Sequence, residues 1–248
     1  MEISPGLSRR RLLGAAAALG GMAGSLPAWA EIVTLGLNGG PAQRELTTAF
    51  PQKGSMILQR TRPPLLETPF EVFDPVSNGG VFTPNDRFFV RWHWSVIPEQ
   101  IDLATFRCGV RGHVNQAQSL TMDDVLALPR FEIAAVNQCS GNSRGLFAPR
   151  IAGGQWQNGA MGNAKWTGVR LRDVLDRAGV KPGAVAVRFN GLDEPVVDGA
   201  PDFMKSLSID HARDGEVMLA YQMNGEQLPL LNDFPCASWC RAGIQPTG

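Results

Sequence analysis

The sequence contains little of what most metal and disulfide sites are built from. It has three histidines, four cysteines and one tyrosine, and it lacks both the CxxC and the HExxH spacing. The cysteines stand at 108, 139, 236 and 240, which is not the spacing of a disulfide framework. We therefore expect neither a structural zinc site nor a small fold held by disulfides.

The sequence also lacks an excess of charge of either sign. Its 23 basic and 23 acidic residues cancel to a net charge of zero. A chain that binds nucleic acid or an acidic membrane surface usually carries a basic excess. Nucleic acid is therefore not expected as a partner.

The first thirty residues have the composition of an export signal. Ser8-Arg9-Arg10-Arg11 precedes an apolar run over 14–26 and the small-x-small pattern at 28–30. The arginine pair predicts a twin-arginine signal over 1–30, recognised by the Tat export machinery, and hence a periplasmic protein. An ordinary secretory signal or a membrane anchor is the alternative. The twin-arginine pathway exports folded proteins, which indicates a cofactor loaded before export.

The remaining residues suffice for one domain of mixed secondary structure. Residues 31–64 are rich in Pro and Gly and predict an extended arm with loops. The run from Arg87 to Ile97 predicts a strand with Arg87, Arg91 and His93 on one face. Further strands are expected at 106–114, 131–136, 184–190 and 216–222, a strand followed by a turn at 206–212, and helices at 120–128 and 167–178. Short strands mixed with short helices predict an α+β fold.

One cysteine has a setting that suggests chemistry. Cys139 follows the apolar strand 131–136 in the turn NQCSGNSRG at 137–145, and a Gly-rich segment follows at 153–166. A polar turn at the end of a strand is suited to hold a reactive or metal-bound thiolate. Taken alone, Cys139 would more often be a buried free thiol.

Four motifs in order resemble one family. TPNDRFFVRWH (83–93), NQCSGNSRG, NGAMGNAKWTGVRLRDVL (158–175) and AYQMNGEQLPLLNDFP (220–235) are similar to the molybdenum domain of the sulfite oxidase family. The resemblance extends to the bacterial sulfite dehydrogenases that pass electrons to cytochrome c. It places a molybdopterin-binding domain over 65–235.

The resemblance implies roles for individual residues. Cys139 matches the cysteine that ligates molybdenum, and a soft thiolate suits that metal. Arg91 and Arg144 match arginines of the substrate pocket, with His93 beside them. The residues that match cofactor contacts are Phe88, Phe89, Val90, Arg91, Asp193 and, where animal members often have histidine, Asn232. Those expected in the pocket wall are Met161, Gly162, Asn163 and Trp166.

The resemblance also implies an activity. The family binds the molybdenum–molybdopterin cofactor and oxidises sulfite to sulfate. The sequence contains no haem motif, so electrons would leave to a cytochrome c or a cytochrome c subunit. A sulfane dehydrogenase of sulfur oxidation and a non-catalytic remnant of the fold are the alternatives.

The tail 236–248, CASWCRAGIQPTG, departs from the family pattern. It lacks a strand period and places two cysteines where the family has none. With one base restored after Pro235, a permitted choice of codons reads LRLVVPGWYSTYW, which matches the family. We therefore interpret the tail as the product of a frameshift. We expect the C-terminal β-sandwich domain that makes full-length relatives dimeric to be missing.

Overall fold

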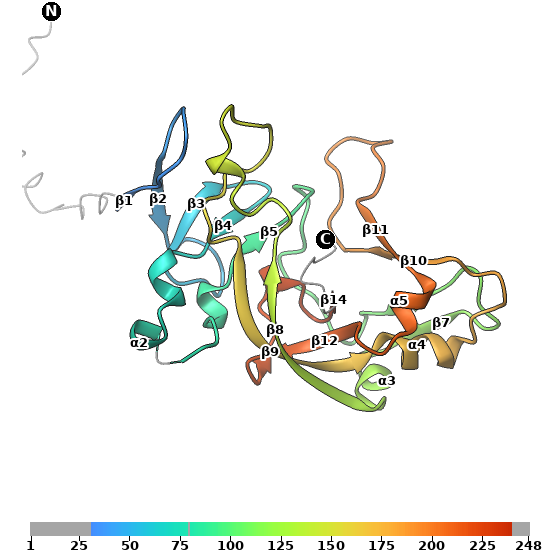
Figure 1. The fold of residues 1–248 in the computed structure, drawn as a ribbon. Coiled ribbons are helices and arrows are strands. Elements are labelled where there is room, and N and C mark those ends of the chain that lie inside the picture. The colour runs from blue at the N-terminus through green and yellow to red at the C-terminus, as the bar shows by residue number, and fades with distance from the viewer. Residues whose placement is uncertain (1–30, 79, 240–248) are drawn as a thin grey trace, which may run out of the picture. The chain divides into compact units, whose positions relative to one another are not determined.

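The computed structural model describes residues 31–78 and 80–239, and their backbone forms antiparallel sheets with short helices (Figure 1). One sheet has the strand order β1-β2-β3-β4-β5. Its strands are β1 Ile32–Thr34, β2 Gln43–Thr47, β3 Met56–Arg60, β4 Leu65–Glu67 and β5 Val90–Arg91. The mixture of several sheets with short helices confirms the predicted α+β class.

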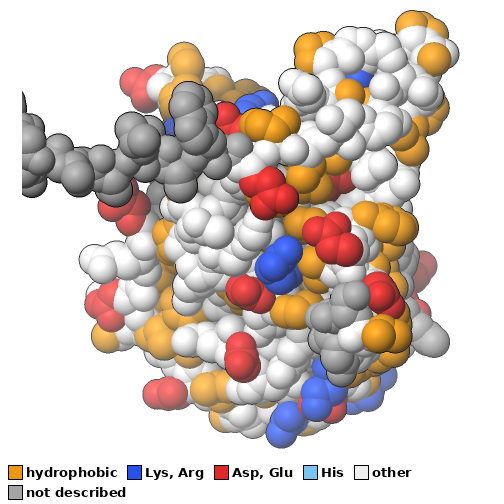
Figure 2. Space-filling model, turned by 90° about the vertical axis from the view of Figure 1, so that its left-hand side faces the viewer, with side chains coloured by type: hydrophobic (Ala, Val, Ile, Leu, Met, Phe, Trp, Pro, Cys, Tyr) orange, Lys and Arg blue, Asp and Glu red, His pale blue; other side chains and the backbone are white. Residues whose placement is uncertain are grey.

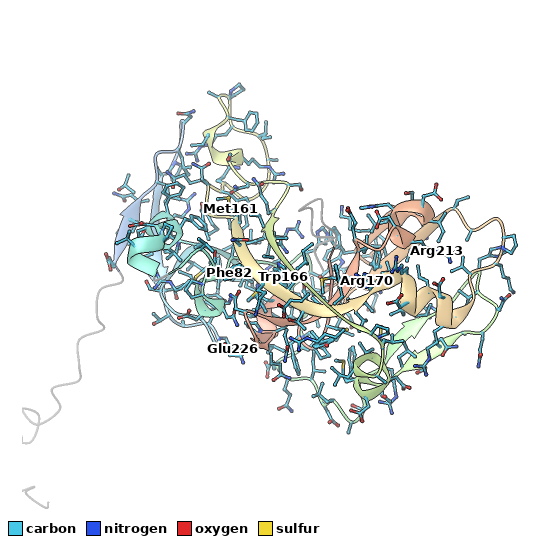
Figure 3. The ribbon with its side chains drawn as sticks, turned by 60° about the horizontal axis from the view of Figure 1, so that its bottom comes forward. Phe82, Met161, Trp166, Arg170, Arg213 and Glu226 are labelled. Atoms are coloured by element: carbon cyan, nitrogen blue, oxygen red, sulfur yellow. The ribbon has the colours of Figure 1, made fainter. Side chains whose placement is uncertain are left out.

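A second sheet carries the long strands of the molecule (Figure 1). Its order is β13-β12-β9-β8, and β14 also pairs with β12. The strands are β8 Arg130–Gln138, β9 Met161–Arg170, β12 Met218–Met223, β13 Glu226–Gln227 and β14 Ala237–Trp239. β8 and β9 pair along their whole length, from Arg130 opposite Val169 to Gln138 opposite Met161. Met161, Trp166 and Arg170 follow one another along β9 in Figure 3.

Two further pairs of strands and several short helices complete the described residues. β6 Cys108–Val110 pairs with β7 Gln118–Leu120, and β10 Ala186–Asn190 pairs with β11 Met204–Ser208. The α-helices are α2 Pro75–Asn78, α3 Met122–Leu126, α4 Leu171–Ala178 and α5 Ile209–Arg213. The 3₁₀ turns are η1 Phe70–Phe73, η2 Asn85–Arg87, η3 Arg144–Leu146 and η4 Leu230–Asn232. Among these residues no helix is both long and apolar enough to cross a membrane.

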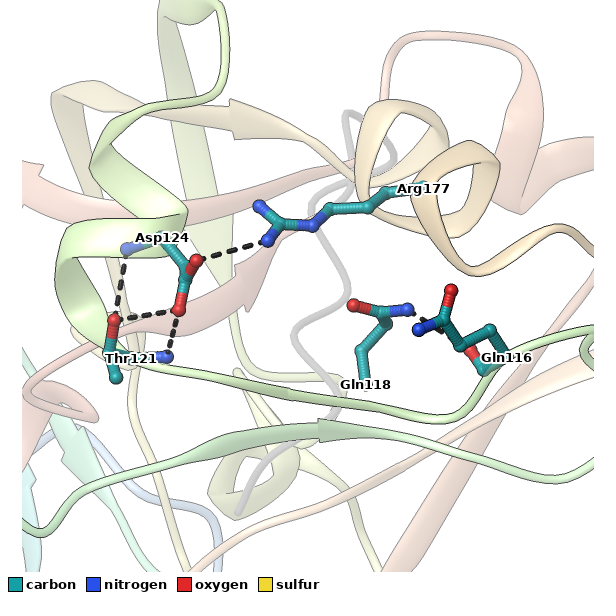
Figure 4. A network of polar contacts seen from close by, with 5 residues as sticks. All are labelled: Gln116, Gln118, Thr121, Asp124 and Arg177. Atoms are coloured by element: carbon teal, nitrogen blue, oxygen red, sulfur yellow. Dashed lines mark hydrogen bonds and ion pairs between the residues drawn. The ribbon is translucent and has the colours of Figure 1, made fainter.

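Local sequence explains the two best-defined helices. In α3, Thr121 and Asp124 form a capping box, in which each side chain accepts the other's backbone N–H. Asp124 also accepts from Arg177 of α4, at 3.0 Å, so the pair joins the two helices (Figure 4). In α4, Leu171, Val174, Leu175 and Ala178 share one buried face. The helix ends at Gly179, whose φ of +68° is the left-handed conformation that glycine adopts easily.

The structure corrects the prediction for 31–64. The sequence predicted an extended arm with loops, but these residues contain β1, β2 and β3. Each of these strands has three to five residues. Segments this short, separated by Pro and Gly, leave no window in which a period of two could be recognised. The prediction was therefore wrong in its secondary structure.

The predicted strand from Arg87 to Ile97 is also wrong in most of its length. Only Val90–Arg91 forms a strand, and the preceding residues form η2. Phe88, Phe89 and Val90 are all buried, so the two faces do not alternate. The physical reason is that two core clusters meet here: Phe88 and Phe89 pack in one and Val90 in the other.

Two predicted boundaries differ from the observed ones. The helix expected at 167–178 begins at Leu171, because residues 167–170 belong to β9, which pairs with β8 and, over its C-terminal half, with β12. This error arises because buried strand residues and a buried helix face share the same apolar composition. The turn expected at the end of 206–212 forms α5, Ile209–Arg213, behind an N-cap at Ser208.

The tail does contain a strand within the described residues. Ala237–Trp239 pairs with Met218–Ala220 of β12, although the sequence predicted no strand after Pro235. The edge of β12 can form backbone hydrogen bonds with any residue, whatever its side chain. The small side chain of Ala237 fits the core, where it is 3% exposed. Residues 240–248, like the predicted signal at 1–30, lie outside the described residues.

On the face shown in Figure 2, basic and acidic side chains are interspersed with apolar and uncharged ones.

Candidate functional site

The candidate site is built around the turn that follows β8. Cys139 is 8% exposed and packs in the largest core cluster with Phe88, Trp156 and Trp166. Its backbone N–H donates to Ala160 O (2.9 Å), and the N–H of Gly141 donates to its Sγ (3.4 Å). The sulfur therefore sits in the polar turn that ends β8, as the sequence predicted, and a backbone N–H donates to it.

The Gly-rich loop 153–160 holds this turn from the other side. Ser143 N donates to Gln157 O (2.7 Å), and Gly145 N donates to Trp156 O (2.9 Å). In return, Ala160 N donates to Asn142 Oδ1 (3.0 Å). These reciprocal hydrogen bonds fix the position of the turn relative to the loop.

The buried carboxylate of Glu67 fixes the position of the Gly-rich loop 153–160. Glu67, at the end of β4, is 1% exposed, and its Oε1 accepts from Gln157 N (2.9 Å) and Gly159 N (2.8 Å). Its Oε2 accepts from Gln59 Nε2 (2.6 Å). Gly159 is required here, because a Cβ would collide with the Thr68 carbonyl and lie 2.6 Å from Glu67 Cγ. Burial raises the pKa of Glu67, and these donors oppose that effect.

Several basic side chains surround Cys139. Arg91, at the end of β5, interacts electrostatically with the Cys139 sulfur, with Arg60 at the end of β3, and with Arg144. Burial lowers the pKa of Arg91. The nearby charge of Cys139 opposes this effect, whereas the charges of Arg60 and Arg144 add to it. The Arg144 guanidinium lies against Gly141, where a Cβ would be 3.1 Å from Cζ. The structure thus brings Arg91 to Cys139 and Arg144 to the neighbouring Gly141, and it adds Arg60 near Arg91, which the sequence analysis missed.

His93 lies beside Arg91 on an aromatic ring that the sequence analysis also missed. Its ring stacks on Phe203 with centroids 3.9 Å apart, and Arg91 Cζ lies 5.4 Å from the same ring. Lys205 Nζ lies 4.8 Å from that ring. Burial and the charge of Arg91 lower the pKa of His93, which favours the neutral imidazole. No motif in the sequence linked Phe203 or Lys205 to the site.

The predicted cofactor residues fall into two groups. The side chains of Phe88, Phe89 and Val90 are inside the core. The carbonyl of Phe88 accepts from Lys53 Nζ (3.0 Å) and that of Phe89 from Asn232 Nδ2 (3.0 Å). Asn232 Oδ1 accepts from Lys53 Nζ (2.6 Å), so the oxygen and the nitrogen of the Asn232 side chain both have hydrogen-bond partners within the protein. This group shapes the region from inside the core.

Asp193 is the predicted contact that keeps a free acceptor. It is 4% exposed, and its Oδ2 accepts from Trp94 N (2.9 Å). Within the described residues, its Oδ1 and the Trp94 indole N–H are buried without a hydrogen-bond partner. Buried polar atoms are rarely left unpaired, because this costs about 1–3 kcal/mol. A polar ligand with donors and acceptors would satisfy both atoms.

The expected wall residues belong to β9. Trp166 and Gly162 are buried, and Trp166 packs edge-on against Phe88 at 5.6 Å. Asn163 N donates to Thr83 Oγ1 (3.1 Å), which ties β9 to the loop before η2. These contacts place Gly162, Asn163 and Trp166 in the core that supports the site.

This arrangement fits an anionic, metal-bearing cofactor. One thiol is available as a soft ligand, and Arg60, Arg91 and Arg144 offer positive charge around it. The unpaired atoms of Asp193 and Trp94 supply further polar contacts. Among the described residues, no group of three or more His, Cys, Asp and Glu could hold a metal ion.

Comparison with known proteins agrees with this fit. Residues 94–238 match the oxidoreductase molybdopterin binding domain. Mitochondrial sulfite oxidase of Homo sapiens is 39% identical over 160 residues, which are 62% of this chain and 29% of that protein. Nitrate reductase [NADH] of Ulva prolifera is 34% identical over 171 residues, 65% of this chain and 19% of that protein.

A solved structure is also similar. The sulfane dehydrogenase SoxCD of Paracoccus pantotrophus matches with a TM-score of 0.62 and 25% identity, over 79% of this chain and 46% of that chain. The chain spans less than a third of the length of the mitochondrial sulfite oxidases that it matches.

Replacing Glu67 with alanine should destabilise the chain. The N–H groups of Gln157 and Gly159 would lose their buried acceptor, which costs about 2–4 kcal/mol in total. Urea denaturation checks this, with Glu67→Gln expected to lose less because it keeps one carbonyl oxygen. Glu71 is exposed, so Glu71→Ala is the matched control and should unfold at the same urea concentration as the wild type. A Glu67→Ala variant as stable as that control would contradict the role.

Asp233→Asn should stabilise the chain in a pH-dependent way. Burial, and next the charge of Asp193, raise the pKa of Asp233 to about 7, from 3.8. The Asp233 side chain contributes its full stability below the pKa that it has in the unfolded chain. This contribution is lost as the pH rises through the higher pKa that it has in the folded protein. Asparagine avoids that loss and tolerates the φ of +66°.

The urea midpoints of Asp233→Asn and the wild type should be compared at pH 5 and pH 8. The gain in unfolding free energy should be about 2–3 kcal/mol greater at pH 8. An equal gain at both pH values would contradict the assignment of this titration to Asp233.

Proposed function

The chain belongs to the oxidoreductase molybdopterin binding domain family, and on that premise we propose that it oxidises sulfite to sulfate at a molybdenum centre held by Cys139. The observation that carries the proposal is that Arg91 interacts electrostatically with the Cys139 sulfur and that Arg60 and Arg144 lie near Arg91. The molybdenum–molybdopterin cofactor supplies the oxygen-transfer and two-electron redox chemistry when bound. The protein supplies the ligand, the anion pocket and the exclusion of water.

Cys139 is the residue that would hold the metal. A thiolate ligand needs a fixed position, which the hydrogen bonds from the 153–160 loop provide. The Gly141 N–H donates to Sγ, and Arg91 interacts electrostatically with the sulfur. Asp193 Oδ1 and Trp94 Nε1 would bond the polar cofactor.

Arg91 and Arg144 would bind the sulfite dianion. A guanidinium offers paired N–H donors in the plane of an oxyanion, so it holds orientation as well as charge. His93 is held on Phe203 next to Arg91, in the neutral form that its lowered pKa favours. A neutral imidazole can donate one hydrogen bond and accept another, so it can orient the substrate without adding charge.

We extend the proposal to the partners and the location. Electrons would leave to a cytochrome c or to a cytochrome c subunit. The twin-arginine pathway would place the protein in the periplasm, and full-length relatives would dimerise through a domain that follows the matched region. The support for these statements is the sequence pattern and the resemblance described above.

A sulfane dehydrogenase is the second candidate. The specific observation in its favour is the structural match to SoxCD, which extends over 79% of this chain. Such an enzyme would act on a sulfane sulfur in place of sulfite. Comparing sulfite with a persulfide substrate in the same assay separates the two candidates.

The Cys139→Ser variant tests the metal ligand. The full chain is produced in a host that makes the cofactor, and molybdenum content and sulfite-dependent reduction of cytochrome c are measured. We expect molybdenum and activity in the wild type, and activity reduced at least about 100-fold in Cys139→Ser, because the hydroxyl is a poor soft ligand. Cys240→Ser is the matched control and should keep both.

Two results would contradict the proposal. Substantial activity in Cys139→Ser would reject Cys139 as the ligand. A folded wild-type chain that takes up neither molybdenum nor pterin would indicate a non-catalytic protein that retains the fold.

The Arg91→Met variant tests the anion pocket. Removing one charge-assisted contact to the substrate should raise the Michaelis constant for sulfite about 10-fold or more, with a smaller change in kcat. Arg130→Met is the matched control, because the Arg130 side chain is 65% exposed and pairs with Glu132. Steady-state kinetics at equal molybdenum content is the measurement, and an unchanged Michaelis constant would count against Arg91.

A further inference from the structure

Two cysteines outside the candidate site meet across the fold. Cys108 begins β6, in the pair of strands β6–β7. Cys236 directly precedes β14, which joins the sheet of β8, β9 and β12. The two residues are far apart in the sequence, and β6 and β14 belong to different sheets, so only the tertiary structure brings the two cysteines together.

The two thiols are in direct contact. Their side chains are hydrogen-bonded to each other, and both cysteines are free thiols and only partly exposed. A disulfide has an S–S length of about 2 Å and a Cβ–Cβ separation of about 3.5–4.5 Å. To form this bond, the two sulfur atoms would have to close from hydrogen-bond contact to bonding distance.

A cavity gives a reagent access to this pair. Cys108 and Cys236 line the same cavity of about 240 Å³, together with Phe106, Arg107 and Phe234. The lining side chain of Arg107 attracts anionic thiol reagents such as glutathione. Cys139 instead lies in the turn after β8, among the core residues described above.

We propose that Cys108 and Cys236 are a dithiol site that an oxidant of the disulfide class converts to an intramolecular disulfide. The Cys108 thiolate attacks one sulfur of the oxidant's S–S bond, and that bond breaks. The released half takes up a proton. Cys236 then loses its proton and attacks the Cys108 sulfur of the mixed disulfide, which expels the second half as a thiol. Two protein thiols are oxidised and one disulfide is reduced to two thiols.

The environment of the pair supports this order of attack. The hydrogen bond with Cys236 lowers the pKa of Cys108. The same bond, together with burial and the charge of Asp233, raises the pKa of Cys236. A thiol with the lower pKa reacts first because more of it is thiolate.

The bond would fasten the last described strand to the rest of the fold. Phe234 and Ala237, on either side of Cys236, pack in the same core cluster as Cys139. A link to β6 would therefore restrain a segment that supports the candidate site. It would also close a loop of about 130 residues, which stabilises the folded state by restricting the unfolded chain.

Peptide mapping of the oxidised full chain tests the proposal. Reduced wild type, Cys240→Ser and Cys236→Ser are equilibrated with glutathione disulfide and reduced glutathione, alkylated and digested with trypsin. Cleavage after Arg107, Arg111, Arg213 and Arg241 places Cys108 in peptide 108–111 and Cys236 in peptide 214–241. We expect these peptides to be joined, two hydrogens lighter than their sum, in wild type and Cys240→Ser. They should be separate in Cys236→Ser.

Thermal melting provides the second measurement. Oxidation should raise the melting temperature of wild type and Cys240→Ser by about 5 °C or more, and should leave that of Cys236→Ser unchanged. Separate, alkylated peptides in oxidised Cys240→Ser would overturn the proposal. So would an equal yield of linked peptides in Cys236→Ser, because Cys240 would then be the partner. Neither measurement depends on molybdenum or on sulfite oxidation.

Discussion

The buried carboxylate of Glu67 is the constraint on which the candidate site depends. It accepts two backbone N–H groups of the Gly-rich loop, and that loop bonds the turn of Cys139 at several points. A carboxylate this deeply buried is costly unless its oxygens are hydrogen-bonded. The loop therefore has one conformation that satisfies Glu67, and the same conformation positions the thiol. Packing, hydrogen bonding and the position of the reactive sulfur are thus set together.

The charges around Cys139 suit an anion. Burial lowers the pKa of Arg91, and the nearby charges of Arg60 and Arg144 lower it further. Cys139 and Asp193 offset part of this charge. Like charges gathered at a partly buried site raise the free energy of the folded protein, and an anionic ligand removes that cost. The same interaction that weakens the fold locally therefore provides affinity for an anionic cofactor or substrate.

Proteins similar to this chain differ in the reaction that their names give, since sulfite oxidases, a nitrate reductase and a sulfane dehydrogenase are among them. Residues 94–238 of this chain match the oxidoreductase molybdopterin binding domain. On the proposed function, Cys139, its turn and the Gly-rich loop would serve the metal centre. The choice of substrate would then come from the surroundings of Arg91 and His93, where Phe203 and Lys205 lie.

The parts of this protein that the sequence predicted well are those controlled by near neighbours. The strand at 131–136 appears within β8, and the helix of Leu171–Ala178 ends at Gly179 as expected. The interactions that form turns and helix caps join residues only a few positions apart, so they can be predicted from the sequence. The predictions failed where tertiary burial replaces periodicity: Phe88, Phe89 and Val90 are all buried because two core clusters enclose them.

The sequence by itself determined that the chain is of mixed α+β class, that Cys139 ends a strand in a polar turn, and which family its motifs resemble. Only the tertiary structure decided that Glu67 holds the Gly-rich loop, that Arg60, Phe203 and Lys205 lie at the site, and that Cys108 touches Cys236. The physical reason is that these contacts join strands and loops far apart in the chain. Such contacts leave no spacing or period in the sequence from which they could be predicted.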